Sequence, residues 1–313
     1  MKKRLYSFLS ILTLSIILTA CGSDEQASSD VKEDAQKEVQ SYTVTDDAGN
    51  EVKFDQVPEK IVSLQPSNTE ILFELGVGDK IIGATEYDNY PKEAKKIERV
   101  SDSVVINTEA IIAMKPDAVI AYTIGDENAL KPIKEAGIPV FVIKSATSID
   151  DIYGDINQLA KVMGVEEKGK EIVNDIKEQI NAVQEKTADI KKPAKVYYEI
   201  SPSPDIFTTG SQTFQQEILE MAGVENIFAE QTGWVKISEE EVLKRNPQVI
   251  LTTVNYVEDP IGEIKSRANW KSVEAIANNQ VHQLDNDIMS RPGPRIGEAA
   301  ELVAKAVYPE LFE

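Results

Sequence analysis

The feature that most constrains the fold is an internal repeat with a constant register. Asn107-Thr108-Glu109 leads through an apolar helical pattern to Pro116 and a β-branched run, and Ser238-Glu239-Glu240 leads to Pro247 and a similar run. The offset is constant, because 240 − 109 and 247 − 116 both equal 131. Two copies of one helix–proline–strand unit predict two structurally related halves.

Short β-branched runs alternate with helical patterns from about Tyr42 onward, which is typical of an α/β fold with largely parallel sheets. Ser67 with Glu70, and Ser238 with Glu241, predict capping boxes at the N-termini of two helices. The predicted strands are Lys60–Leu64, Ile81–Glu86, Asp117–Tyr122, Pro139–Ile143, Lys195–Ile200, Val249–Val254 and Val281–Leu284.

A charged segment from Glu166 to Asp189 separates the two sets of strands. It has no proline and carries Ile172, Ile176, Ile180 and Val183 on one helical face. A helix of about 24 residues is about 36 Å long. We therefore expect one long α-helix that joins two Rossmann-like lobes with parallel sheets.

The N-terminus carries an export signal. Three basic residues, at positions 2–4, precede an apolar run that is too short to be a stable membrane anchor. The run ends in small residues before Cys21, the only cysteine, which is the arrangement that lipoprotein processing requires. We expect Cys21 to be lipidated and to hold the protein on the extracytoplasmic face of the cell membrane.

Composition divides the rest of the chain. Residues 22 to about 40 are polar and lack aromatics, which predicts a flexible tether. The expected segments are a signal peptide at 1–20, a lipidated tether at 21–41, an N-terminal lobe at 42–165, a linking helix at 166–192 and a C-terminal lobe at 193–313. Loss of the signal removes three positive charges, so the mature charge is −20 − 3 = −23, which disfavours binding to nucleic acid.

Catalysis finds little support in the sequence. Cys21 is used for lipid, and the single histidine, His282, lies in an apparent strand, where a packed or strand-edge role is typical. A zinc site needs several histidine and carboxylate ligands, and no glycine-rich phosphate loop follows a strand. We expect no enzyme activity, no metal and no cofactor.

Aromatic residues and an arginine lie at the ends of predicted strands or in the connections between elements, where an α/β sheet places its ligand crevice. These residues are Tyr87, Tyr122, Phe207, Trp234 and Arg291. They predict a large, flat ligand in a cleft between the lobes. Tyr90, beside Pro91, is expected in the core instead, and Arg295 is expected to hold the turn before the final helix.

From about Lys60 to the C-terminus the chain resembles class III periplasmic binding proteins, the ferric-siderophore, haem and cobalamin group, and its cobalamin-binding members most. The most specific stretches are residues 61–70 (IVSLQPSNTE), 87–91 (YDNYP), 115–120 (KPDAVI) and 290–295 (SRPGPR). The resemblance implies two α/β lobes joined by one long helix. It also implies a monomer that delivers its cargo to an ABC permease and, through it, to an ATPase.

The resemblance also implies site residues. Cobalamin-binding members line their cleft with side chains that match Tyr87, Tyr122, Phe207, Trp234, Asp287 and Arg291 here. A further cleft tryptophan of the group falls at or near Ser103, and this departure leaves the exact ligand open. One glutamate on each lobe forms salt bridges to permease arginines, and the matching positions are Glu109 and Glu240. Both also lie where a helix dipole favours a glutamate.

A corrinoid is the leading ligand, because a wide macrocycle with apolar faces suits aromatic walls. A ferric siderophore suits the same cleft, with arginine for its negative charge. Haem needs an axial ligand, for which Tyr87 and His282 are the candidates. Outside this class, an enzyme predicts turnover of its ligand, and a structural surface lipoprotein predicts no small ligand.

Overall fold

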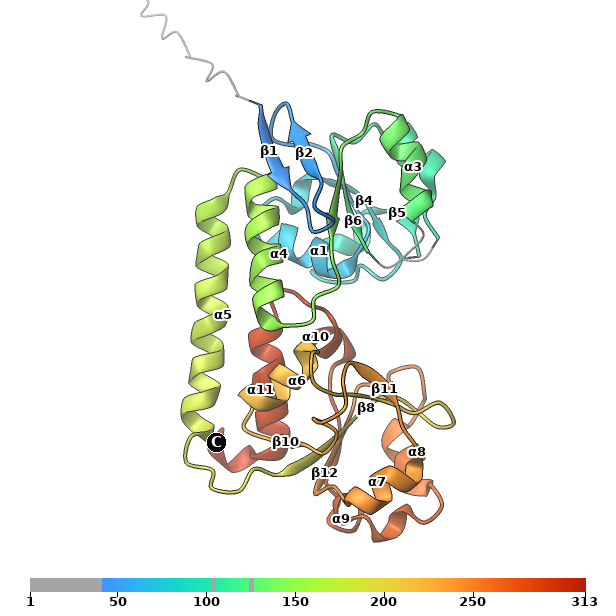
Figure 1. Ribbon diagram of the computed structural model, residues 1–313, viewed down its shortest axis with the longest axis vertical. Coiled ribbons are helices and arrows are strands. Elements are labelled where there is room, and N and C mark those ends of the chain that lie inside the picture. Colours follow the sequence, from blue (N-terminus) through green and yellow to red (C-terminus); the bar gives the residue numbers. More distant parts are fainter. Residues whose placement is uncertain (1–40, 103–104, 124–126) are drawn as a thin grey trace, which may run out of the picture. The chain divides into compact units, whose positions relative to one another are not determined.

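The computed structural model describes residues 41–102, 105–123 and 127–313, which belong to one compact unit (Figure 1). The predicted signal peptide, Cys21, almost all of the tether, and Ser103 lie outside the described residues. Within the described ranges, no helix combines the length and the apolar character that a membrane span requires.

The first sheet contains five parallel strands in the order β5-β4-β3-β6-β7. They are β3 (Ile61–Ser63), β4 (Ile81–Thr85), β5 (Glu98–Ser101), β6 (Ala118–Tyr122) and β7 (Val140–Ile143). β3, β6 and β7 are apolar almost throughout and nearly completely buried, as expected of parallel strands that helices cover on both faces. An antiparallel pair, β1 (Tyr42–Thr45) and β2 (Glu51–Phe54), precedes this sheet.

Helices cover both faces of the first sheet. They are α1 (Pro66–Glu74), α2 (Thr108–Met114), α3 (Glu127–Glu135) and α4 (Ile149–Val162). Successive strand residues point to opposite faces. Ile61 and Ile120 therefore join the hydrophobic cluster that includes α1 and α4, whereas Val62 and Val119 join the cluster that includes α2 and α3.

The second sheet is mixed, in the order β11-β9-β8-β12-β13, with β10 also paired to β8. Its strands are β8 (Lys195–Ser201), β9 (Phe207–Thr209), β10 (Glu225–Asn226), β11 (Trp234–Lys236), β12 (Val249–Thr252) and β13 (Val281–Gln283). The three predicted strands β8, β12 and β13 are parallel, as expected, and so is β10, but β9 and β11 run antiparallel to their neighbours. Only residues 202–206 connect β8 to β9, and a parallel crossover needs a dozen residues or more.

The remaining helices complete the second half. They are α6 (Phe214–Met221), α7 (Glu239–Arg245), α8 (Pro260–Ser266), α9 (Glu274–Ala277), α10 (Asn286–Ser290) and α11 (Ile296–Val307). Short 3₁₀ turns lie at η1 (Gly78–Lys80), η2 (Lys92–Lys96), η3 (Trp270–Ser272) and η4 (Pro309–Leu311). α7, α8 and α9 cover one face of the second sheet, and α6 and α11 pack against the other.

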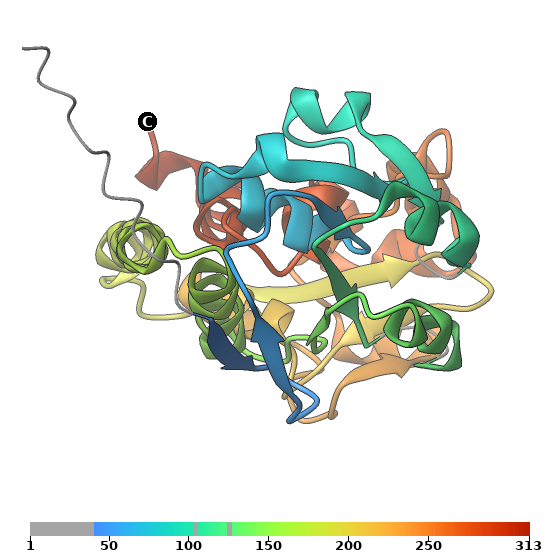
Figure 2. The ribbon, with the colours of Figure 1, turned by 90° about the horizontal axis from the view of Figure 1, so that it is seen from above.

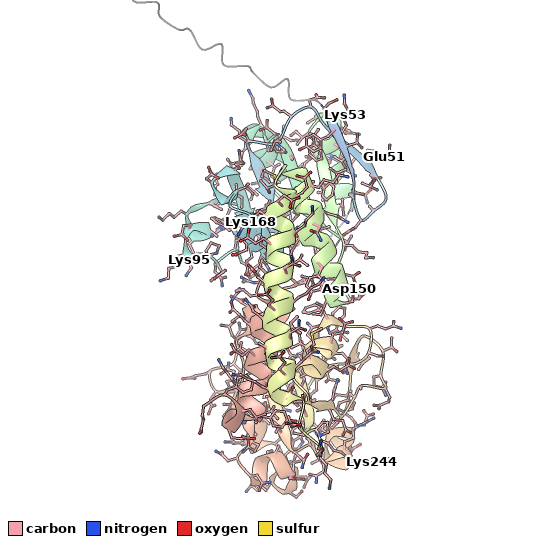
Figure 3. The ribbon with its side chains drawn as sticks, turned by 90° about the vertical axis from the view of Figure 1, so that its left-hand side faces the viewer. Glu51, Lys53, Lys95, Asp150, Lys168 and Lys244 are labelled. Carbon is pink, nitrogen blue, oxygen red and sulfur yellow. The ribbon has the colours of Figure 1, made fainter. Side chains whose placement is uncertain are left out.

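The predicted long helix is α5 (Glu166–Thr187), a single helix of 22 residues. Its buried face includes Ile172, Ile176, Ile180 and Val183, as predicted. α5 packs against α4 and α11, and Figure 2 looks down α4 and α5 side by side. Its opposite face carries charged residues such as Lys168 (Figure 3). One continuous hydrophobic cluster joins α5 to residues of both sheets.

Local geometry confirms the internal repeat. α2 and α7 begin after Asn107 and Ser238, whose side chains cap the helices. Their C-cap residues are Lys115 and Asn246, which adopt left-handed backbone conformations with φ of 51° and 47°. Because 246 − 115 is also 131, the two units share both their boundaries and their unusual backbone geometry.

One of the two predicted capping boxes is wrong. Ser238 and Glu241 form theirs, because the Ser238 hydroxyl accepts from Glu241 N and the Glu241 carboxylate accepts from Ser238 N. Ser67 does not cap α1. The helix begins at Pro66, and the side chain of the preceding residue, Gln65, forms no capping hydrogen bond. Proline is favoured at the first helical position, so the helix starts earlier than the serine predicts.

Candidate functional site

Tyr87 lies in the loop that follows β4, at the carboxyl edge of the first sheet, and its side chain is 57% exposed. The loop is anchored at Asp88, which is buried. Asp88 Oδ2 accepts a hydrogen bond from Thr85 N at 2.9 Å and one from the Thr85 hydroxyl, and Arg99 donates to Asp88 O at 2.8 Å. Burial raises the pKa of Asp88, although hydrogen bonds from Thr69 and Thr85 oppose this.

Arg291 brings three of the predicted site residues together. Its Nη2 donates to Tyr87 O at 3.0 Å and pairs with Asp287 Oδ1 at 2.9 Å. Its Nη1 donates to Asn89 Oδ1 at 2.8 Å and to Glu70 Oε1 at 2.7 Å. Asn89 Nδ2 in turn donates to Asp287 Oδ2 at 2.8 Å. Tyr87, Asp287 and Arg291 therefore form one hydrogen-bonded group, in which Arg291 already uses both terminal nitrogens.

Tyr90 is not a core residue, contrary to the prediction. Its side chain is exposed, and the Arg295 guanidinium lies 4.2 Å from the centre of its ring. The ring thus packs against a cation rather than against apolar side chains. Arg295 lies directly before α11, as expected, and donates through Nε and Nη2 to both oxygens of Glu70, at 2.8 and 2.7 Å.

Tyr122 ends β6 on the same edge of the first sheet, separated from the Tyr87 loop by β3. It is partly buried. Burial raises the pKa of its hydroxyl, a hydrogen bond with Ser145 opposes this, and the nearby Asp155 carboxyl raises it further. In the described part of the chain, no hydrogen bond or ring contact joins Tyr122 to the Tyr87 loop.

Phe207 and Trp234 come together on the antiparallel β9–β11 ribbon. Trp234 pairs with Thr209, and Lys236 pairs with Phe207. Opposite residues share a face and alternate residues return to it, so Phe207 and Trp234 lie on the same face. They are 36% and 43% exposed, and Trp234 Nε1 donates to Gln215 Oε1 at 3.2 Å.

The structure adds an aromatic residue that the sequence analysis missed. Tyr256 follows β12 and is 70% exposed. A nearby surface hollow of about 410 Å³ is lined by Asn255 and by residues 283–287, which follow β13 and include Asp287. Tyr256 comes shortly after an apolar strand, the same signal that singled out Tyr87, so the sequence contained the information.

Glu109 and Glu240 occupy the second positions of α2 and α7, and their side chains are exposed. The constant offset therefore extends to their place in the helices. Over residues 41–102, 105–123 and 127–313, neither glutamate forms an ion pair or a side-chain hydrogen bond.

A separate buried charge cluster lies at the end of β8. Arg267 donates to both oxygens of Glu199, at 2.6 and 2.9 Å, and pairs with Glu263 at 2.6 Å. The Tyr197 hydroxyl donates to Glu199 at 3.0 Å. Burial raises the pKa of Glu199 and Arg267 opposes the shift. Glu199, Arg267 and Tyr197 are all buried, so this cluster braces the second half internally.

The described part of the chain contains no cluster of histidine, cysteine and carboxylate side chains that could hold a metal ion. His282 lies on β13, and its Nε2 is 3.0 Å from Gln280 Oε1. Burial lowers the pKa of His282, and the charge of Lys265 lowers it further. The histidine is thus a half-buried residue on the edge strand of the sheet, which is one of the two roles that the sequence suggested.

Comparisons with known proteins agree on one family. The profile of the periplasmic binding protein family matches residues 61–288. The chain is 37% identical over 318 residues to YvrC of Bacillus subtilis (strain 168), an uncharacterized ABC transporter substrate-binding lipoprotein, with all of both chains covered. It is 34% identical over 240 residues to a vitamin B12-binding protein of Vibrio parahaemolyticus, which covers 76% of this chain and 85% of that protein. A solved structure of a possible iron-binding (periplasmic solute-binding) protein from Staphylococcus epidermidis has a TM-score of 0.73 and 33% identity, and covers 81% of this chain and 100% of that one.

Proposed function

We propose a function from the premise that this chain belongs to the periplasmic binding protein family, whose profile spans most of it. Its fold is the class III fold of that family. It is a substrate-binding lipoprotein of an ABC transporter, in the group that includes vitamin B12 and haem binders. Such proteins bind a small molecule and deliver it to a permease, and they are not enzymes. Within this class, we propose that the ligand is a corrinoid.

The observation that carries the corrinoid proposal is the set of exposed aromatic side chains on the loop after β4 and on the β9–β11 ribbon. Tyr87, Phe207 and Trp234 are 57%, 36% and 43% exposed, although each ring can bury about 150–250 Å² of surface. A corrinoid ring presents apolar faces to such residues and amide groups at its edge. Asp287 and Arg291 supply polar groups for that edge, and Tyr122 supplies a further ring. The 34% identity to a vitamin B12-binding protein supports the same ligand.

A ferric complex, bound through a siderophore or as haem, is the second candidate. The specific observation in its favour is the similarity to a possible iron-binding protein at 33% identity. Arg291 suits an anionic ligand, because guanidinium groups bind carboxylates and related anions in a bidentate way. Its terminal nitrogens are engaged by Asp287 and by first-sheet groups, so an anionic ligand must compete for them.

Tryptophan fluorescence distinguishes these ligands. The chain has two tryptophans, of which Trp270 is fully buried and Trp234 is exposed. We expect cyanocobalamin to quench the Trp234 signal saturably, and haemin and a ferric hydroxamate to do so only at higher concentration. If a ferric ligand saturates the quenching at a lower concentration than cyanocobalamin does, the ferric complex becomes the leading ligand and the corrinoid the second.

Substitution of Trp234 localises the site. Trp234→Ala is expected to weaken binding by at least about 2 kcal/mol, roughly thirtyfold, because truncated aromatic anchors typically cost this much. The matched control is Tyr153→Ala, which removes an aromatic ring from α4 whose face is covered by Lys177. Isothermal titration calorimetry measures both variants. Equal affinities for the two variants would place the ligand elsewhere.

We propose that Glu109 and Glu240 dock the protein on its permease, one from each half. Their equivalent places in α2 and α7 and their exposure suit paired contacts with basic residues. Glu109→Ala combined with Glu240→Ala is expected to abolish uptake and to preserve ligand affinity. The control is Glu178→Ala with Glu185→Ala, which removes the same charge from the exposed face of α5. Normal uptake by the first variant contradicts the docking role.

The anchor and the lobe boundaries are part of the same proposal. We propose a monomer in which residues 42–165 and 193–313 act as lobes on either side of the linking segment 166–192. Lipidation of Cys21 then holds the protein on the extracytoplasmic face of the membrane. The similarity to a lipoprotein over the whole chain supports this arrangement. Cys21→Ser is expected to release the protein into the medium and to remove labelling by palmitate.

A further inference from the structure

A buried carboxylate with two arginine partners links the two halves of the chain. Glu70 on α1 is 3% exposed. Its Oε1 accepts from Arg291 Nη1 and Arg295 Nη2, both at 2.7 Å, and its Oε2 accepts from Arg295 Nε at 2.8 Å. Together with Asn89 and Asp287, these residues form what we call the Glu70 clamp. Glu70 and Asn89 belong to the first half, and the other three members belong to the second.

The clamp joins segments that are far apart in the sequence. Arg291 is 221 residues from Glu70, and Arg295 is 225 residues from it. Arg291 also holds the backbone oxygen of Tyr87, so the loop that carries this exposed ring is attached to the segment after β13. The clamp thus fixes a residue of the proposed site on one half relative to Asp287 and Arg291 on the other.

Stability alone does not account for this arrangement. A buried ion pair contributes little net stability compared with apolar side chains of the same volume, because desolvation offsets the attraction. A fully hydrogen-bonded polar network does, however, specify one geometry. The clamp therefore suits a role in which relative position matters more than the free energy of unfolding.

Hydrogen-bonded charge pairs hold both arginines, and Arg295 has free space beside it. A cavity of about 130 Å³ adjoins Glu70 and Arg295 and is also lined by Tyr90, Asp175 and Glu298. Arg295 therefore has space into which it can move. If Glu70 loses its charge, two guanidinium groups remain close together without their shared carboxylate, and their repulsion favours separation.

We propose that Glu70 is a positioning residue that sets the spacing of the ligand-binding surfaces on the two halves. Glu70 is buried and does not contact the ligand itself. It holds Arg291 and Arg295, and through Arg291 it holds the Tyr87 loop. This inference rests on the proposed function for its effect on binding, but the spacing itself is a property of the free protein.

The direct test measures the spacing without ligand. Nitroxide labels are placed by Lys95→Cys and Lys244→Cys, at exposed positions in the two halves (Figure 3), in a chain that carries Cys21→Ser. Double electron–electron resonance then gives the distance distribution. Glu70→Gln keeps the size of the side chain and removes its charge, so we expect a broader distribution with a longer mean. An unchanged distribution overturns the proposal.

The matched control is Glu199→Gln. Glu199 is equally buried and accepts from both terminal nitrogens of Arg267, but this pair lies within the second half. We expect Glu199→Gln to lower thermal stability and to leave the distance distribution unchanged. Equal broadening in both variants shows general destabilisation and also overturns the proposal. If Glu70→Gln does not fold, Arg295→Gln removes one cation and is judged by the same criterion.

Ligand affinity provides the second readout. If the molecules whose two halves keep the wild-type spacing fall to about a tenth of the population, ligand affinity falls about tenfold. Cyanocobalamin is the probe, titrated into the wild type, Glu70→Gln and Glu199→Gln. Weaker binding by Glu70→Gln together with a broadened distribution supports the inference, and broadening with unchanged affinity refutes the link to the site. Failure of the wild type to bind cyanocobalamin rejects the corrinoid proposal, while the distance measurement still decides the spacing.

Discussion

Asp155 allows a quantitative test of the electrostatics of the first half. It lies on α4, is 5% exposed, and has no hydrogen-bond partner for its carboxyl group in the described part of the chain. Burial raises its pKa from 3.8 to about 8, the negative charges of Asp47 and Asp151 add to the shift, and Lys144 opposes it. The carboxyl group is therefore protonated at neutral pH in the folded protein and ionised in the unfolded chain.

This difference determines how stability changes with pH. Between pH 3.8 and about 8, folding requires the uptake of a proton by Asp155, so the free energy of unfolding falls by about 1.4 kcal/mol for each pH unit. The stability contribution is fully present below pH 3.8 and is lost as the pH rises through 8. At pH 7 the uptake of this proton has lowered the free energy of unfolding by about 4 kcal/mol. Asp155→Asn removes this loss, because the amide does not ionise.

Urea unfolding at pH 5 and pH 7 measures the effect. We expect Asp155→Asn to be more stable than the wild type, with an advantage that grows by about 3 kcal/mol between these pH values. Asp151→Asn is the control, because its expected effect on the free energy of unfolding has the opposite sign. Burial opposes its shift, but hydrogen bonds from Thr147 and Ser148 outweigh this and lower the pKa of Asp151. An advantage of Asp155→Asn that does not change with pH refutes the reasoning.

Four further substitutions test the packing and the polar interactions, each by urea unfolding. Arg267→Met leaves the Glu199 carboxylate buried without its cation and is expected to cost about 3–5 kcal/mol, and a cost below 1 kcal/mol contradicts it. Gly169→Ala places a Cβ 2.6 Å from an atom of α4 and is expected to cost about 1–3 kcal/mol, whereas Gly154→Ala meets no atom within 4 Å and should stabilise α4. Ser238→Ala removes the cap of α7 and is expected to cost about 1 kcal/mol, and a neutral result shows that the cap is dispensable.

The strands that the sequence predicted most closely include those whose apolar runs are buried on both faces. β3, β6, β7 and β12 differ from their predicted ranges only at the ends, because continuous β-branched runs between helices have few alternatives. β1, β2, β5 and β9–β11 were not predicted. They are short, and their formation depends on pairing with a neighbour rather than on their own pattern.

Long-range contacts limited the prediction of the site. Glu70 had a local interpretation as part of a capping box, but its actual partners, Arg291 and Arg295, lie more than 200 residues away in the chain. Local spacing carries no information about such contacts. Tyr87 was found because it follows a strand that the sequence predicts, whereas Phe207 and Trp234 were singled out as aromatic residues in polar connections, since β9 and β11 were not predicted. Their role in binding stays a prediction.

The continuous hydrophobic cluster has a consequence for how the protein denatures. Ile61 of the first sheet, Ile176 of α5 and Leu251 of the second sheet belong to one buried cluster. A fragment that ended before α5 would expose its share of that cluster to water and lose much of the burial that stabilises it. We therefore expect the two halves to unfold in one cooperative transition, and a protease that cleaves the chain near α5 to act on the globally unfolded protein rather than on a separable domain.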